Sequence, residues 1–218
     1  MQSTKNRRAF LSTTLAAAAG CATISFIPVA GLSTDFLPDE GENIIGPRKG
    51  YSPQIGTLVS MMNWMRTTVL YSVKDMKQAD LDYLHDEKSN TIGAMLMHLA
   101  ATETFYQANT FEGRSDYNDT EKQKWESAMN LGDAGRKDIK GHELDYYLDI
   151  LKQTREKTLA EFRKRDDKWL MTIDPKFFGE QPTNNYCKWF HVCEHESNHN
   201  GQIKWLKGRL PGASHKSE

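Results

Sequence analysis

The stretch HVCEHESNHNGQIKWLKGRLPG, residues 191–212, decides the fold of this chain. Its apolar residues follow the i, i+3, i+4, i+7 spacing of an amphipathic helix, and Pro211-Gly212 ends the pattern. Within it, His195 and His199 are separated by one helical turn. Both imidazoles therefore point from the same side of the helix and can bind one metal ion.

Three further segments show the same helical spacing, and none shows a strong strand alternation. The predicted helices cover residues 53–77, 91–111, 143–165 and 184–207. Long helices in this number are typical of a four-helix bundle. We therefore predict an all-α fold, a four-helix bundle over residues 53–212 with a tail at 213–218. The connections at 112–141 and 166–183 are long enough to hold short helices.

A third histidine occupies an equivalent place on another predicted helix. In TIGAMLMHLAATETFY, residues 91–106, His98 lies beside the apolar stripe, as His195 and His199 do on the last helix. His191 lies further toward solvent. The three imidazoles can converge on one metal ion only if the two helices face each other at the same height, which periodicity does not establish. The alternative is that they are structural histidines at the edge of the core.

Four charged residues lie on apolar faces, one on each predicted helix. They are Arg66, Glu103, Arg155 and Glu196. Buried charges are tolerated when they are paired, so this set predicts an Arg/Glu network in the core. The network is either structural or placed around the metal ligands. The alternative is that these side chains extend from the stripe edges to solvent.

The two quoted stretches resemble helices of the DinB-like superfamily. Residues 191–212 are similar to its last helix, with H-x3-H followed by N-G-Q-I, and residues 91–106 are similar to its second helix. The resemblance covers roughly residues 53–212 and implies a four-helix bundle with a metal bound by three histidines. Carried over to this chain, the implied ligands are His98, His195 and His199. Family members include bacillithiol and mycothiol S-transferases and a thiol-dependent isomerase, which are cytoplasmic.

The N-terminus predicts export, which departs from those relatives. Residues 1–32 combine a basic start with an Ala-rich apolar run, and Arg7-Arg8 resembles a twin-arginine signal. An ordinary secretory signal is the alternative. Cys21 follows Ala-Ala-Gly and is a candidate lipidation site, although Ala18 replaces the usual large aliphatic residue. Residues 33–52 are rich in Gly, Pro and charge and are predicted to be a linker.

Composition limits the partners. The chain has 218 residues with a formal net charge of -1, which gives no basis for nucleic-acid binding. We expect a small-molecule substrate, which the resemblance suggests is a thiol. Membrane attachment through a lipid on Cys21 and assembly into a homodimer remain open. Localisation in the periplasm or cell envelope follows from the predicted signal.

Three imidazoles leave a metal ion with an open coordination position, where it can lower the pKa of a bound water or thiol. The first hypothesis is therefore a metal-dependent transferase or hydrolase, with Glu103 and His191 as candidate proton acceptors. The alternative is a non-catalytic metal-binding or ligand-binding envelope protein. We expect a divalent metal, zinc first, with nickel, iron and manganese as alternatives because imidazole suits all of them.

Overall fold

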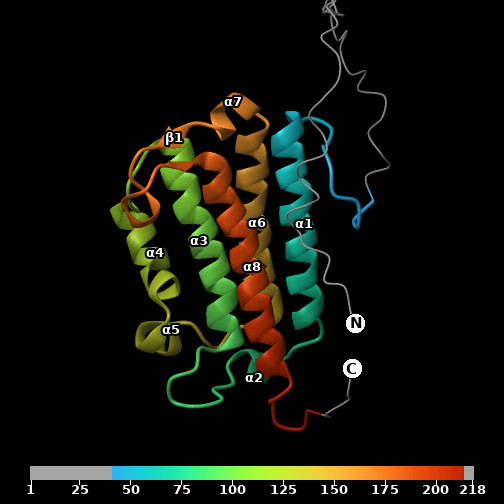
Figure 1. The fold of residues 1–218 in the computed structure, drawn as a ribbon. Coiled ribbons are helices and arrows are strands. Elements are labelled where there is room, and N and C mark those ends of the chain that lie inside the picture. The colour runs from blue at the N-terminus through green and yellow to red at the C-terminus, as the bar shows by residue number, and fades with distance from the viewer. Residues whose placement is uncertain (1–40, 214–218) are drawn as a thin grey trace, which may run out of the picture. The chain divides into compact units, whose positions relative to one another are not determined.

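The computed structural model describes residues 41–213, and Figure 1 draws the rest of the chain in grey. The predicted export signal at 1–32, which includes Cys21, lies outside the described residues, as do the first part of the predicted linker and most of the tail. No helix within residues 41–213 is long and apolar enough to cross a lipid bilayer.

Within the described residues, four long helices run side by side (Figure 1). They are α1 (Pro53–Val73), α3 (Ile92–Glu112), α6 (Leu144–Phe162) and α8 (Asn185–Lys207). The main packing contacts join α3 to α6 and to α8, and α1 to α8. The prediction of an all-α four-helix bundle is confirmed.

The predicted bounds differ from the observed ones mainly at the ends of α1 and α6. Helix α1 ends at Val73 rather than at Lys77, because Lys74 leaves helical geometry and Asp75 adopts a left-handed φ of 65°. Helix α6 ends at Phe162 rather than at 165. Apolar periodicity continues past Val73 to Met76, so it does not locate the end of α1, whereas Phe162 is the last apolar residue of the α6 pattern.

Side-chain caps set the start of the two helices that carry the histidines. Thr91 Oγ1 accepts a hydrogen bond from the backbone N–H of Ala94 at 3.1 Å at the start of α3. Asn184 Oδ1 accepts one from the N–H of Cys187 at 2.8 Å at the start of α8. Each cap satisfies a backbone donor that has no partner within the first turn of its helix.

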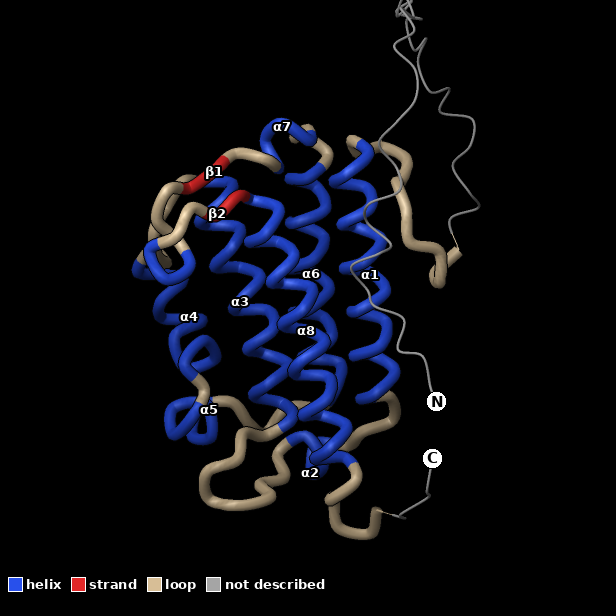
Figure 2. The backbone as a smooth tube through the Cα atoms, in the orientation of Figure 1, coloured by secondary structure: helices blue, strands red, loops and turns tan. Residues whose placement is uncertain are grey.

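The connections hold short elements, shown in Figure 2. They are α2 (Gln78–Leu81), α4 (Asp119–Asn130), α5 (Gly132–Asp138), α7 (Asp167–Leu170), β1 (Ile173–Asp174), the 3-10 helix η3 (Phe178–Glu180) and β2 (Thr183–Asn184). The strands pair antiparallel, with Ile173 opposite Asn184. Strands of two residues are too short to produce an alternating pattern, which is why the sequence did not predict them. Helix α4 packs against α3.

Residues 41–52, the described part of the predicted linker, lie against α1. The N–H of Gly46 donates to Ser60 Oγ at 3.1 Å. Gly56 faces the same segment so closely that an added Cβ would meet the backbone nitrogen of Arg48 at 2.4 Å. This segment therefore contributes packing contacts to the surface of α1.

Candidate metal centre

The three candidate histidine ligands lie together between α3 and α8. One ring nitrogen from each of His98, His195 and His199 falls within 4.8 Å of the other two. The Nε2 atoms of His98 and His195 are 2.9 Å apart. The ring centroid of His199 lies 4.9 Å from that of His98 and 4.5 Å from that of His195. The packing of α3 on α8 thus places His98 level with His195 and His199 along the bundle, as one shared metal site requires.

Hydrogen bonds from the outer ring nitrogens orient two of these imidazoles. Nδ1 of His98 donates to the backbone carbonyl of Ala128, on α4, at 2.9 Å. Nδ1 of His199 donates to Oε1 of Gln202 at 3.0 Å. Because each Nδ1 then carries the ring proton, each Nε2 keeps its lone pair, and Nε2 of His98 faces His195. Partners of this kind set the tautomer of metal-ligating histidines.

The surroundings keep all three imidazoles uncharged. Burial lowers the pKa of His98 below its usual range. Burial and the neighbouring histidines lower the pKa of His195 to about 3. Burial and His98 lower the pKa of His199 to about 4. The neutral imidazole is the form that binds a metal ion, so near neutral pH the rings need release no proton to do so.

The donor set fits a divalent metal ion such as zinc. One nitrogen from each of three imidazoles, all within 4.8 Å of one another, is a group that could hold such an ion. Among the described residues, this group contains three histidines and no carboxylate. Three protein ligands leave a coordination position for a substrate. His195 is half-buried while its two partners are buried, which places the more accessible side of the site at His195.

The four charges predicted on apolar faces form a buried network in the centre of the bundle. Arg66 Nη2 lies 2.9 Å from Glu103 Oε2 and 2.6 Å from Glu196 Oε1. Arg155 Nε lies 2.8 Å from Glu103 Oε1, and Arg155 Nη2 lies 2.6 Å from Glu196 Oε1. No side chain of the four is more than 8% exposed. Each long helix contributes one charge, so the ion pairs join all four.

Backbone carbonyls satisfy guanidinium donors that the carboxylates do not reach. Arg66 Nη1 donates to the carbonyl of Leu151 at 2.9 Å, and Arg155 Nη1 donates to that of Met62 at 2.9 Å. Burial raises the pKa of Glu103, but the nearby Arg155 and Arg66 guanidinium groups outweigh it and hold that pKa below its usual range. The carboxylate is therefore charged in the folded protein at neutral pH.

The two candidate proton acceptors differ in their surroundings. Glu103 is fully buried and accepts hydrogen bonds from both arginines and from Thr158, so it is committed to the network. His191 is half-buried, and its Nδ1 lies 3.1 Å from Glu194 Oε2. The ring centroid of His191 is 5.3 Å from that of His195, so it lies beside the triad and outside it.

The comparisons with known proteins agree with this geometry. Residues 57–212 match the profile of a protein family described as Mycothiol-S-transferase. The chain belongs to this family. The match spans the bundle from α1 to the end of α8 and confirms the resemblance to DinB-like proteins drawn from the two helical stretches. No curated protein matches the chain.

The structure adds residues to the site that sequence reasoning missed. Ala128 contributes only a backbone carbonyl, which every residue type carries, so its side chain gives no signal. Thr102 Oγ1 lies 3.5 Å from Nε2 of His195, and Gln202 holds His199. The contact of Gln202 with His199 could have been predicted, because Gln202 follows His199 by three residues and so lies on the same side of the helix.

Proposed function

We propose that this protein is a metal-dependent S-transferase that joins a small thiol to an electrophilic second substrate. The observation that carries the proposal is the convergence of three uncharged imidazoles with no carboxylate in the described group. Membership of a family described as Mycothiol-S-transferase supports a thiol of the mycothiol type as first substrate. Zinc is the proposed metal, because three imidazoles and an open position suit it.

A bound divalent metal would supply a Lewis acid that lowers the pKa of a nearby thiol and so makes it nucleophilic near neutral pH. The chain's own residues prepare this site. Burial keeps the rings of His98, His195 and His199 neutral, and the Ala128 carbonyl and Gln202 hold two of them in place. The half-buried His195 leaves an approach for the substrate.

Metal analysis combined with a transfer assay tests the proposal. Protein purified without chelator is expected to hold one equivalent of metal and to couple mycothiol to 1-chloro-2,4-dinitrobenzene with release of chloride. His98→Ala and the double variant His195→Ala/His199→Ala should lose both properties. His191→Ala, which changes a neighbour outside the triad, should keep its metal and is the matched control.

Each failure in this assay has a distinct meaning. Stoichiometric metal in the double variant would refute the triad as the binding site. Metal-loaded protein that transfers no thiol would instead support the non-catalytic alternative. Product that forms without any thiol would indicate hydrolysis.

We further propose that the protein acts in the periplasm or cell envelope. The support is the sequence alone: a basic, Ala-rich N-terminus with Arg7-Arg8, and Cys21 as a candidate site for a lipid anchor. A twin-arginine route carries folded cargo, and a metal site built from two helices exists only in the folded chain.

A further inference from the structure

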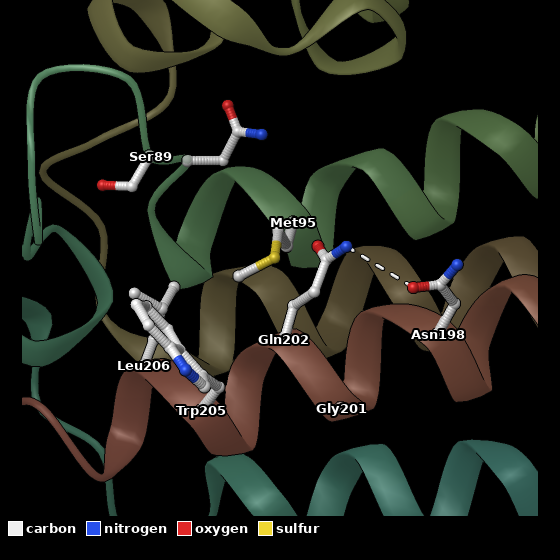
Figure 3. A pocket seen from close by; sticks show the side chains of 8 residues that line it. Ser89, Met95, Asn198, Gly201, Gln202, Trp205 and Leu206 are labelled. Atoms are coloured by element: carbon white, nitrogen blue, oxygen red, sulfur yellow. Dashed lines mark hydrogen bonds between the residues drawn. The ribbon is translucent and has the colours of Figure 1, made fainter.

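A cavity of about 510 Å³ lies between the start of α3 and the second half of α8 (Figure 3). Its lining includes Met95, Asn198, Gly201, Gln202, Trp205 and Leu206. All of its lining side chains are apolar, amide or hydroxyl groups, and none carries a charge. A carboxylate or phosphate would find no opposite charge among them, so the chemistry of the lining favours an uncharged and largely apolar ligand.

One residue in the wall of the cavity contacts the histidine triad. Gln202 lines the cavity, and its Oε1 accepts the hydrogen bond from Nδ1 of His199. Met95, on the facing helix, lies one turn before His98. Figure 3 shows the Gln202 amide turned toward Asn198, to which its Nε2 donates at 3.4 Å, while Met95 of α3 lines the same cavity. The cavity and the triad thus share Gln202, so a ligand in the cavity would lie beside the residue that orients His199.

Gly201 keeps one side of this cavity free of side-chain atoms. Glycine in a helix interior costs about 1 kcal/mol relative to alanine, so its presence needs a reason. At Gly93 the reason is packing, since a Cβ there would meet Tyr147 Oη at 2.8 Å. A Cβ at Gly201 would meet nothing within 4 Å, and its φ is not left-handed. Gly201 is itself exposed, so the lack of a side chain leaves this side of the cavity open.

Trp205 offers an aromatic surface at the same cavity. Its side chain is 48% exposed, although it is the largest apolar side chain available. The guanidinium carbon of Arg209 lies 3.7 Å from a ring centroid of the indole, and the ring of His85 meets the indole edge-on at 4.9 Å. Both neighbours contact the indole, and its remaining exposed surface is available to an apolar or aromatic group.

We propose that this cavity binds the second substrate of the transferase, an uncharged electrophile with an apolar or aromatic body. The inference rests on the proposed S-transferase function. In the reaction, the thiol sulfur forms a bond to the electrophilic carbon, and the bond from that carbon to its leaving group breaks. The leaving group departs with the electron pair, and the thiol proton passes to solvent.

Binding of an unreactive analogue tests the cavity separately from catalysis. We choose 1,3-dinitrobenzene, which keeps the nitroaromatic body but has no leaving group, and measure its affinity for metal-loaded protein by calorimetry. Gly201→Phe fills the open side of the cavity and should weaken binding about tenfold or more. Trp205→Ala removes the aromatic wall and should weaken it about three- to tenfold. Gln153→Phe adds an aromatic on the exposed side of α6, away from the cavity lining, and should bind as wild type.

The outcomes separate the two proposals. Weaker binding in either cavity variant, with Gln153→Phe unchanged and the metal content and melting temperature retained, supports the assignment. Absent binding to wild type, or wild-type affinity in both cavity variants, overturns it. Steady-state kinetics of the transfer reaction give an independent test. Gly201→Phe should raise the KM for 1-chloro-2,4-dinitrobenzene but not the KM for iodoacetamide, which is too small to need the cavity. A wild-type protein that transfers thiol to neither compound contradicts the proposed function, whatever the binding result.

Discussion

Replacement of Glu103 by Gln should destabilise the protein by about 3–5 kcal/mol, the cost of leaving buried ions unpaired. Glu103 is completely buried and meets two guanidinium groups at 2.8–2.9 Å. The substitution keeps the shape of the side chain but removes its charge, which leaves Arg66 and Arg155 with Glu196 as the remaining anion of the network. Urea unfolding monitored by circular dichroism gives the free energy directly.

A matched control lies on the same helix. Glu112, at the end of α3, pairs with Arg114 at 2.7 Å, but the Glu112 side chain is 42% exposed. Glu112→Gln should therefore cost less than about 1 kcal/mol, as exposed ion pairs do. The double variant Glu103→Gln/Arg66→Met restores charge balance and should cost less than the sum of its single substitutions. A loss below about 1 kcal/mol for Glu103→Gln itself would refute the claim that the network is an interdependent buried unit.

The remaining predictions concern pH, the metal and export. Between pH 6.5 and about 3, the unfolded chain takes up a proton on His195, whose folded pKa is about 3, while the folded chain does not. The metal-free protein should therefore lose stability as pH falls through this range, measured as a falling melting temperature, and His195→Ala should flatten the slope. Gln202→Leu removes the hydrogen bond that orients a candidate ligand and should weaken metal affinity by about 10–100-fold in competition with a chelator; an unchanged affinity would contradict that role. Joint replacement of Arg7 and Arg8 by Lys should leave folded, metal-loaded protein in the cytoplasm, whereas unchanged envelope yield would favour the ordinary secretory route. Cys21→Ser should abolish detergent partitioning if Cys21 carries a lipid anchor.

Much of the bundle could be predicted because the spacing of apolar residues along the sequence shows where amphipathic helices form. The apolar spacing predicted the four long helices and placed His98, His195 and His199 at the core-facing edges of two of them. The helix ends were less predictable. At the end of α1, for example, the left-handed residue Asp75 interrupts a segment whose apolar spacing continues.

The sequence by itself therefore determined which side of its helix each functional side chain occupies, because that depends only on the helical repeat. It did not determine which residues meet across helices. Tertiary packing decided that His98 lies level with His195, and that each arginine of the network contacts both glutamates. Packing also brought the carbonyl of Ala128 to His98 from a helix in a connecting segment. The physical reason is that the relative axial position and rotation of two helices depend on how their whole surfaces pack together. The apolar period of a sequence describes each helix separately and carries no information about its neighbour.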